Sequence, residues 1–204
     1  MKTRATVLHG EEYFPQLRAV GSHRCQMFKS SPSEGSESAR LMYLLSIAAA
    51  ERSIKIANAY FVPDDLTTQT LLEAAKRGVQ IEVITPGKVI DGRMVRLASR
   101  HRCGELLQCG VRLYEFEPTM FHCKYMVIDD LWTSVGSANF DNRSFRLNDE
   151  ANLNVIGQEI AAGESKTFDE DNARSRELTY TEWCQRPVFE RLMGGAAALF
   201  RSQL

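Results

Sequence analysis

The run Ser53-Ile-Lys-Ile-Ala-Asn-Ala-Tyr-Phe-Val62 decides the fold class, because its mostly apolar residues predict a largely buried β-strand that ends at Pro63. A helix is expected over residues 64–77, with an aspartate as its cap and a glycine as its stop signal. Val79–Ile84 then predicts a second strand. Strand, helix and strand in alternation favour a parallel or mixed sheet covered by helices, which is an α/β fold.

The alternation continues on both sides of this stretch. Apolar residues at helical spacing predict an amphipathic helix over Ala39–Arg52. The other predicted elements are a basic helix from about Asp91 to Gln108, strands at Val111–Phe116, Phe121–Ile128, Trp132–Val135 and Ala151–Ile156, a solvated acidic stretch from Glu164 to Asp171 and a helical end from Thr181 to Phe200. The chain is therefore expected to form a single sheet-centred layer structure.

Length and composition indicate one domain. A chain of 204 residues, 44% of them hydrophobic, is long enough for a full core. Residues 1–38 lack periodicity and end in a run rich in serine and glutamate, so we expect an irregular, linker-like segment there and a single domain over residues 39–204. No run approaches the roughly 18 apolar residues that cross a bilayer, and the N-terminus has no apolar signal-peptide core. The sequence therefore predicts no transmembrane segment.

Charge and cysteine usage exclude several classes of protein. The 25 basic and 26 acidic side chains give a net charge of −1, which argues against a globally basic coat for nucleic acid. Five scattered cysteines without a C-x-x-C pair predict free thiols and a reducing compartment. Neither the cysteines nor the four histidines have zinc-site spacing, and no calcium-binding loop is present. We expect no metal and no other cofactor.

The segment Phe121-His-Cys-Lys-Tyr-Met-Val-Ile-Asp129 carries the candidate chemistry. Side chains alternate along a strand, so His122 and Lys124 are expected to point the same way. Gly136-Ser-Ala-Asn139 follows, where the glycine frees the backbone and its neighbours supply short hydrogen-bonding groups. Such a combination suits phosphoryl transfer, because imidazole attacks phosphorus or moves a proton while the other groups stabilise phosphate oxygens. Taken singly, each part has an ordinary structural interpretation.

The joint pattern H-x-K-x4-D-x6-G-S-x-N resembles the signature of the phospholipase D superfamily. Four longer stretches resemble the C-terminal half of bacterial cardiolipin synthases more closely. They are Ala59-Tyr-Phe-Val-Pro-Asp-Asp65, Glu117-Pro-Thr-Met-Phe-His122, Gly136-Ser-Ala-Asn-Phe-Asp-Asn-Arg-Ser-Phe-Arg-Leu-Asn-Asp-Glu150 and Trp183-Cys-Gln-Arg-Pro187. The resemblance spans most of the chain. It implies a phospholipase D-like mixed β-sheet flanked by helices on both faces, and an enzyme that requires no metal.

The resemblance also implies roles for single residues. His122 would be one of two catalytic histidines, Lys124 and Asn139 would bind the substrate phosphate, and Ser137 would line the same pocket.

Two carboxylates complete the candidate catalytic set. Asp129 ends the H-x-K-x4-D motif, and because it lies on the strand face opposite His122 it is either a structural carboxylate behind the site or merely the turn residue. Glu150 occupies the position at which the family places an acid that hydrogen-bonds the catalytic imidazole, fixes its tautomer and stabilises its cation.

The reaction that the resemblance implies is a two-step displacement. One histidine attacks a phosphodiester to give a phosphohistidine, and the other protonates the departing alcohol and then activates the acceptor. His122 is assigned provisionally as the general acid and base. The acceptor stays open between a lipid, glycerol and water.

Relatives of this type carry two motifs, whereas this chain carries one, so the second is expected from a homodimer or from a missing N-terminal half. The leading hypothesis is a cardiolipin synthase-type phosphatidyltransferase that acts on phosphatidylglycerol or another anionic phospholipid, bound peripherally at the cytoplasmic face of the membrane. The alternatives are a single-motif homodimeric phosphodiesterase or nuclease, which the balanced charge disfavours, and a catalytically inactive lipid-binding remnant.

The basic helix has two open interpretations. Arg93, Arg96 and Arg100 form one stripe, which would meet anionic headgroups or a phosphate backbone, or would equally be a solvated helix face. Tyr60, Phe61 and Met120–Phe121 are expected to border the site, where they would meet acyl chains, although core packing accounts better for most of them.

Overall fold

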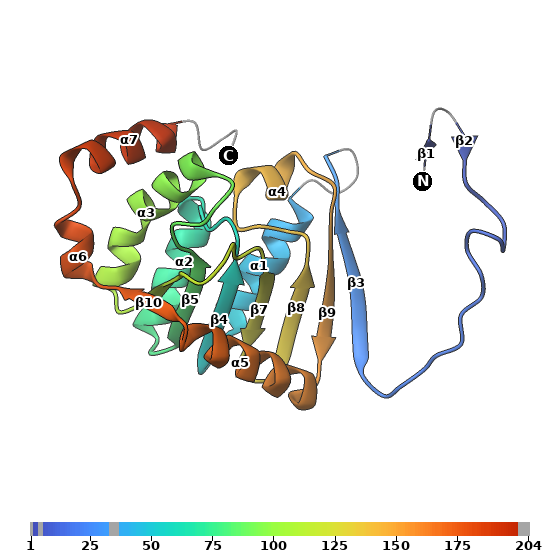
Figure 1. The fold of residues 1–204 in the computed structure, drawn as a ribbon. Coiled ribbons are helices and arrows are strands. Elements are labelled where there is room, and N and C mark those ends of the chain that lie inside the picture. The colour runs from blue at the N-terminus through green and yellow to red at the C-terminus, as the bar shows by residue number, and fades with distance from the viewer. Residues whose placement is uncertain (1, 4–5, 33–36, 200–204) are drawn as a thin grey trace.

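The computed structural model describes residues 2–3, 6–32 and 37–199, and its centre is an eight-stranded sheet with the strand order β10-β6-β5-β4-β7-β8-β9-β3 (Figure 1). The strands are β1 (Lys2–Thr3), β2 (Thr6–Val7), β3 (Arg24–Ser30), β4 (Ser53–Asn58), β5 (Gln80–Pro86), β6 (Arg112–Phe116), β7 (Lys124–Ile128), β8 (Trp132–Gly136), β9 (Glu150–Ile156) and β10 (Ser175–Leu178). The helices are α1 (Ser38–Ala49), α2 (Asp65–Lys76), α3 (Arg93–Gln108), α4 (Asn142–Arg146), α5 (Gln158–Asn172), α6 (Tyr180–Cys184) and α7 (Val188–Leu199).

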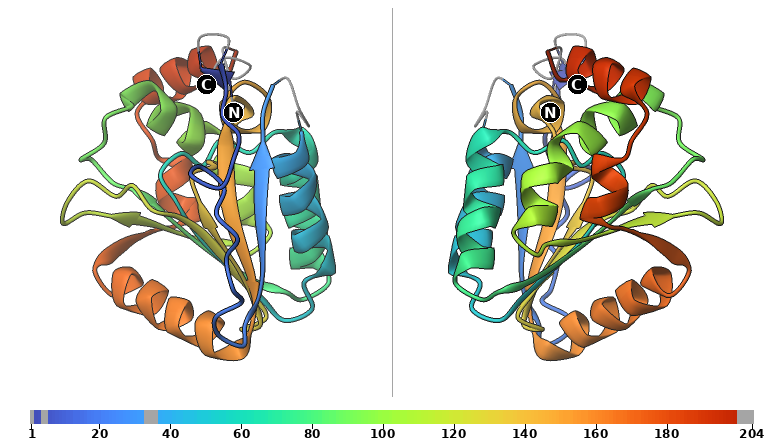
Figure 2. Two further views of the ribbon diagram at one scale, coloured as in Figure 1. Left: turned by 90° about the vertical axis from the view of Figure 1, so that its right-hand side faces the viewer. Right: turned by 90° about the vertical axis from the view of Figure 1, so that its left-hand side faces the viewer.

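The sheet is mixed. β4, β5 and β6 run parallel and are joined through α2 and α3, since parallel neighbours need a crossover connection. The remaining pairs of this sheet are antiparallel. Helices α1, α2 and α3 cover one face and α5 crosses the other, as the two side views show (Figure 2). The predicted fold, an α/β sheet flanked by helices on both faces, is confirmed.

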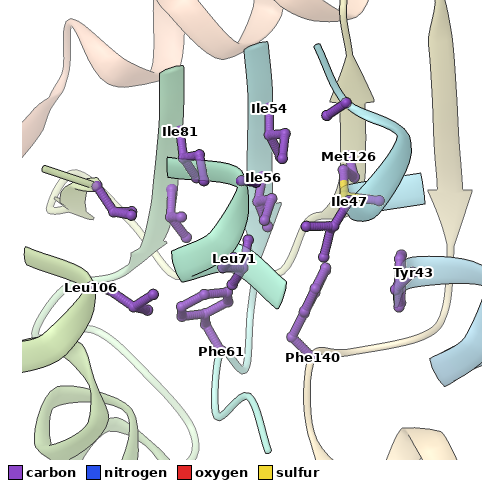
Figure 3. Close-up of a cluster of buried hydrophobic side chains, with 14 of the residues drawn as sticks. Tyr43, Ile47, Ile54, Ile56, Phe61, Leu71, Ile81, Leu106, Met126 and Phe140 are labelled. Carbon is purple, nitrogen blue, oxygen red and sulfur yellow. The ribbon is translucent and has the colours of Figure 1, made fainter. Parts of the chain in front are cut away.

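Strand β4 explains why the deciding stretch is apolar at almost every position. Ile54 and Ile56 point into the core beneath α1 and α2, where they are fully buried together with Leu71 (Figure 3). Ala57 faces the opposite side of the sheet and packs in a second buried cluster with Phe168 of α5. Both faces of β4 are therefore covered, and the charged Lys55 on the α5 side contacts Asp169 of that helix at 2.7 Å.

The N-terminal segment corrects one expectation. We expected residues 1–38 to be irregular, but β3 pairs with β9 along its whole length, from Arg24 opposite Ile156 to Ser30 opposite Glu150. Most of β3 is exposed because it is an edge strand with one neighbour, so it lacks the apolar alternation that a half-buried strand displays. The sheet therefore extends upstream of residue 39. Residues 1, 4–5 and 33–36 lie outside the described part of the chain.

The C-terminal third also differs from expectation. The acidic stretch, expected to be helical and solvated, belongs to α5, whose acidic residues mostly face water as predicted, but the helix also buries Ala161 and Phe168 against the sheet. The helical end divides at Pro187 into α6 and α7, and Phe200 lies outside the described residues. α4 and β10 were not predicted, because both are too short for a periodic signal.

Two further expectations concern the whole described chain. All five cysteines are free thiols, as predicted. Among the described residues, no helix combines the length and the apolar character needed to cross a bilayer.

Candidate active site

The candidate residues meet at one end of the sheet because of strand direction. β8 runs antiparallel to both β7 and β9, so the start of β7, the end of β8 and the start of β9 lie side by side (Figure 1). His122 lies just before β7 and Lys124 is its first residue. Ser137 and Asn139 follow the end of β8, and Glu150 begins β9. Residues far apart in the sequence thus lie together at one end of the sheet.

His122 and Lys124 contact each other directly. The Lys124 Nζ atom lies 3.1 Å from His122 Nδ1 and also donates to the His122 backbone carbonyl at 3.1 Å. The strand expected from residue 121 begins only at Lys124, and the expectation that the two side chains lie on the same side is met. An ammonium donates only, so Nδ1 accepts and the neutral imidazole carries its proton on Nε2.

The half-buried Lys124 ammonium is surrounded by carboxylates. Burial lowers the pKa of Lys124 from its ordinary value, and the negative charges of Glu150, Asp91 and Asp141 act in the opposite direction. The imidazole of His122 is exposed. A cation held in a partly desolvated position beside an open imidazole is an arrangement that favours an anionic ligand.

Gly136 allows the loop after β8 to approach β9 closely. A Cβ atom at this position would lie 2.2 Å from the Ala151 carbonyl oxygen and 2.4 Å from Asn152 Oδ1, so no other residue fits without movement. This corrects the expectation of a freed backbone, because Gly136 is not among the described residues with positive φ. The glycine is needed for space.

The buried amide of Asn139 lacks a complete set of partners. Its side chain is 9% exposed, and its Oδ1 atom has no hydrogen-bond partner among the described residues. Its backbone N–H, by contrast, donates to Ser144 Oγ at 3.0 Å. Buried polar atoms are normally paired, so the unpaired Oδ1 atom marks a place where a ligand that donates a hydrogen bond would be stabilised.

The structure pairs Glu150 with Ser137 and not with His122. The Glu150 carboxylate is 8% exposed, accepts a hydrogen bond from Ser137 Oγ, and accepts a second from Asn148 Nδ2 at 3.2 Å. Ser137 Oγ in turn accepts from the Ala151 N–H at 3.0 Å. The expected contact with the imidazole of the same chain is absent from the described residues. Glu150 here orients the serine of the loop.

Asp129 lies at the other end of β7 from His122, about 20 Å away by strand geometry. Its carboxylate accepts from the backbone N–H groups of Glu51, Arg52 and Ser53 at 2.9, 2.7 and 2.8 Å, and its own backbone has φ of 55°. Asp129 is therefore a turn residue and a structural carboxylate, but the expectation that it stands behind the site is wrong, because the length of β7 separates it from His122. The geometry offers no direct catalytic role for Asp129.

Three further residues lie beside the site: Tyr60, which was expected to border it, and Asp91 and Asp141, which were absent from the candidate set. The Tyr60 ring meets the His122 ring edge-on, with centroids 6.2 Å apart, and its hydroxyl donates to Asp91 at 2.8 Å. Burial and this hydrogen bond raise the pKa of Tyr60 to about 12, and the same bond lowers the pKa of Asp91. Burial raises the pKa of Asp141, which caps α4, to about 6. Their sequence signal is only their place within or near the stretches of the resemblance.

Buried Asn58 ties the end of β4 to the loop after β8. Its Oδ1 atom accepts from the N–H groups of Tyr60 at 3.1 Å and Phe140 at 3.3 Å, and its amide donates to the Ala138 carbonyl at 3.5 Å. This asparagine therefore positions Tyr60 on one side of the site and the loop of Asn139 on the other.

The basic helix α3 turns its arginines inward. Arg96 contacts the buried carboxylate of Glu115 at 2.7 Å, Arg100 lies 3.6 Å from it, and Arg176 of β10 contacts it at 2.7 Å. Neither a headgroup-binding stripe nor a solvated face describes these residues. The side chain of Arg93 lies outside the described part of the chain.

Among the described residues, no group of three or more histidine, cysteine, aspartate or glutamate side chains lies close enough together to hold a metal ion.

Comparison with known proteins decides the family. A family model described as "Cardiolipin synthase, PLD-like domain" matches residues 43–172. The chain belongs to this family. A cardiolipin synthase of Staphylococcus aureus is 34% identical over 197 residues, which are 97% of this chain and 40% of that protein. The major cardiolipin synthase ClsA of Bacillus subtilis is 34% identical over 194 residues, again 40% of its length. This cardiolipin synthase family member thus spans about two-fifths of these relatives.

Solved structures confirm the fold of this family member. Nuc of Salmonella typhimurium, a phospholipase D family member, superposes with a TM-score of 0.67 at 22% identity and covers 78% of this chain and 99% of its own. Phosphatidylserine synthase of Haemophilus influenzae gives a TM-score of 0.68 at 16% identity over 88% of this chain and 47% of its own. At such identities the likeness concerns the fold alone.

Proposed function

We propose that this chain is a phosphatidyltransferase domain of the cardiolipin synthase type, acting on phosphatidylglycerol or a related anionic phospholipid. The observation that carries the proposal is the contact of the Lys124 ammonium with His122 Nδ1 at the end of the sheet where the loop of Asn139 follows β8. Membership of the cardiolipin synthase family and the names of its relatives support the substrate class.

In this proposal the phosphate of the substrate binds between Lys124 and Asn139. The lysine supplies the positive charge and the amide supplies a neutral hydrogen bond to a phosphate oxygen. Ser137 lines the same pocket and is held by Glu150, whose carboxylate accepts the serine hydroxyl. A bound anion would also offset the cost of partly burying the ammonium.

His122 acts as the general acid and base. To protonate a leaving group His122 enters the first step as imidazolium, with the Lys124 ammonium moved from Nδ1 to the substrate phosphate, so that loss of the Nε2 proton gives the neutral ring. In the first step the second histidine forms a nitrogen–phosphorus bond with the phosphatidyl group, and the departing alcohol takes a proton from His122. In the second step His122 accepts the proton of the incoming hydroxyl, whose oxygen displaces the histidine nitrogen from phosphorus.

The second histidine must come from outside this motif. The chain contains one H-x-K-x4-D pattern, and its curated relatives are longer, since it spans 40% of their length. A second copy of the chain or the other half of a longer protein would supply the missing group. In this proposal the domain acts at the membrane surface because its substrate is embedded there, and we assign it to the cytoplasmic face.

The direct test is turnover of phosphatidylglycerol vesicles by the purified chain in EDTA, followed as release of glycerol, with molar mass measured by light scattering. The proposal expects activity from dimers, its loss by at least a hundredfold in His122→Ala, and full activity in the control His9→Ala, whose exposed side chain lies away from the site. Activity of the isolated chain as a monomer would contradict the need for a second motif.

Two other results would decide between the remaining hypotheses. Cleavage of DNA without turnover of phosphatidylglycerol would replace the proposal with a nuclease function. Equal activity in His122→Ala and the parent chain would overturn the assignment of the site itself.

A further inference from the structure

A groove lies between α3 and the α6–α7 segment, and none of its lining residues belongs to the site of His122. Its volume is about 580 Å³. The α6 helix approaches α3 closely, because a Cβ atom on Gly104 would lie 2.3 Å from the ring of Trp183. Four basic side chains, His101, Arg102, Arg186 and Arg191, line the groove, against one acidic side chain.

Arg186 is the unusual member of this group. It is 8% exposed, and its guanidinium stacks on the Trp183 ring at 4.1 Å. Its Nε and Nη1 atoms donate to the carbonyl oxygens of Trp183 and Arg100 at 2.7 and 2.8 Å. No described acidic side chain lies within ion-pair distance of it, although buried charges are normally paired. Its remaining donors border a groove large enough for an anion.

Arg191 adds a second cation without an ion pair among the described residues, and its side chain is exposed at the rim of the groove. Arg102 is different, because it contacts Asp65 at 2.7 Å. The charge of Glu190 acts on Arg186 from beyond ion-pair distance and Glu105 lines the groove, so the arginines leave the groove with an excess of positive charge and not with unopposed cations.

The outer face of α7 beside these arginines is apolar. Val188, Phe189 and Leu192 are 67%, 74% and 69% exposed, and they lie within five residues of one another on the same helix as Arg191. Exposed apolar side chains interleaved with arginine are typical of helices that lie in the interface of an anionic bilayer.

The position of α7 relates this face to the catalytic end of the sheet. Ala197 packs with Val62 and Ala98, so the end of α7 lies against the segment that directly follows Tyr60. Helix α7 lies across the start of α3 at this end of the sheet (Figures 1 and 2).

We propose that the α6–α7 segment docks the domain on an anionic phospholipid surface, with Arg186 and Arg191 binding lipid phosphate in the groove and Val188, Phe189 and Leu192 entering the apolar region of the bilayer. The charge complementarity of the groove and the uncovered apolar face select this occupant. The inference deepens the proposed function by naming the surface that would bring a membrane substrate to the site, and vesicle binding tests it without any turnover.

The experiment is flotation of the full chain with vesicles of phosphatidylglycerol and phosphatidylcholine, compared with vesicles of phosphatidylcholine alone. Arg191→Glu is matched by Lys166→Glu, an exposed position on α5 with the same change of charge. The double variant Phe189→Ser/Leu192→Ser is matched by Leu45→Ser, which removes an exposed apolar side chain from α1. Circular dichroism verifies that each variant folds, and Val188→Ser replaces the double variant if that one does not.

The parent chain is expected to bind the anionic vesicles at least tenfold more tightly than the neutral ones. Both α7 variants are expected to bind the anionic vesicles about tenfold or more weakly than the parent. The matched controls should bind them within about twofold of the parent. Vesicle binding is measured without turnover, so a failure of the catalytic proposal would leave this result unchanged. Parent-like binding by Arg191→Glu would overturn the inference. Retained vesicle binding with a halved molar mass in the Phe189→Ser/Leu192→Ser variant would also overturn it, and would assign the face to contact between copies.

Discussion

Replacing Asp141 by asparagine is expected to stabilise the protein at neutral pH. The carboxylate of Asp141 is 2% exposed and accepts from the Ser144 N–H at 2.8 Å as the cap of α4. Burial, with a contribution from the charge of Glu150, raises its pKa from 3.8 to about 6. Asparagine caps helices as well as aspartate does, so the variant keeps this hydrogen bond and removes only the buried charge.

The magnitude follows from the pKa of Asp141. The folded protein keeps the proton up to about pH 6, whereas the unfolded chain releases it near the ordinary value of 3.8. Stability therefore falls as the pH rises between these values, and above them the charge costs at most about 3 kcal/mol, since one pKa unit corresponds to about 1.4 kcal/mol. The Asp141→Asn variant is expected to be more stable at pH 7 by up to this amount and equal to the parent near pH 4.

Urea unfolding between pH 4 and pH 8 measures the difference, and Asp129→Asn serves as the control of opposite sign. Burial would raise the pKa of Asp129, but the N–H groups of Ser53, Glu51 and Arg52 outweigh it and lower the pKa. The ionised carboxylate of Asp129 stabilises the fold above about pH 4. The free energy of unfolding that Asp129→Asn loses should therefore be largest at neutral pH and become smaller as the pH is lowered. A pH-independent Asp141→Asn difference, or lower stability at pH 7, would refute the reasoning.

Two further substitutions test packing at the site and in the core. Gly136→Ala should lower the free energy of unfolding by about 1–3 kcal/mol, because its methyl group would meet the Ala151 carbonyl oxygen at 2.2 Å. The control Gly163→Ala has no atom within 4 Å of the added methyl group and should be neutral or slightly stabilising. Thermal unfolding measures both differences. Glu115→Ala should cost about 3–5 kcal/mol in urea, since it leaves three arginines facing an empty position, and Glu117→Ala, a more exposed neighbour, should cost less than about 1 kcal/mol.

The sequence was sufficient where burial imposes a pattern. Strand β4 is covered on both faces, so its apolar run is visible without a structure, and the alternation with α2 and α3 predicts the mixed sheet. The edge strand β3 carries no such pattern because both its faces are largely exposed, and only its pairing with β9 reveals it. A strand defined by its neighbour cannot be recognised from its own residues.

In the site, too, some features could be predicted from sequence motifs and others depend on neighbours that only the structure shows. The H-x-K-x4-D and G-S-x-N motifs brought His122, Lys124, Ser137 and Asn139 into one candidate set, and the structure places them at one end of the sheet. The partner of Glu150 depends on how the start of β9 meets the loop after β8, which spacing does not reveal.

The arginine stripe of α3 shows the same limitation. Helical spacing correctly placed Arg96 and Arg100 on one side of the helix, but a sequence does not say what that side faces. The buried Glu115 of β6 lies there, and it converts a candidate ligand surface into part of the core.

The central claim is that His122, Lys124 and Asn139 together bind a phosphate group. Nuclear magnetic resonance of the ¹⁵N-labelled imidazole during titration with sn-glycerol 3-phosphate tests it most directly. The free protein should show His122 with its proton on Nε2, and titration with the ligand should shift the imidazole ¹⁵N signals of the parent chain. The Lys124→Met and Asn139→Ala variants should bind the ligand at least tenfold more weakly, as judged from the same shifts. A His122 signal that does not move at ligand concentrations that shift other residues would contradict the account.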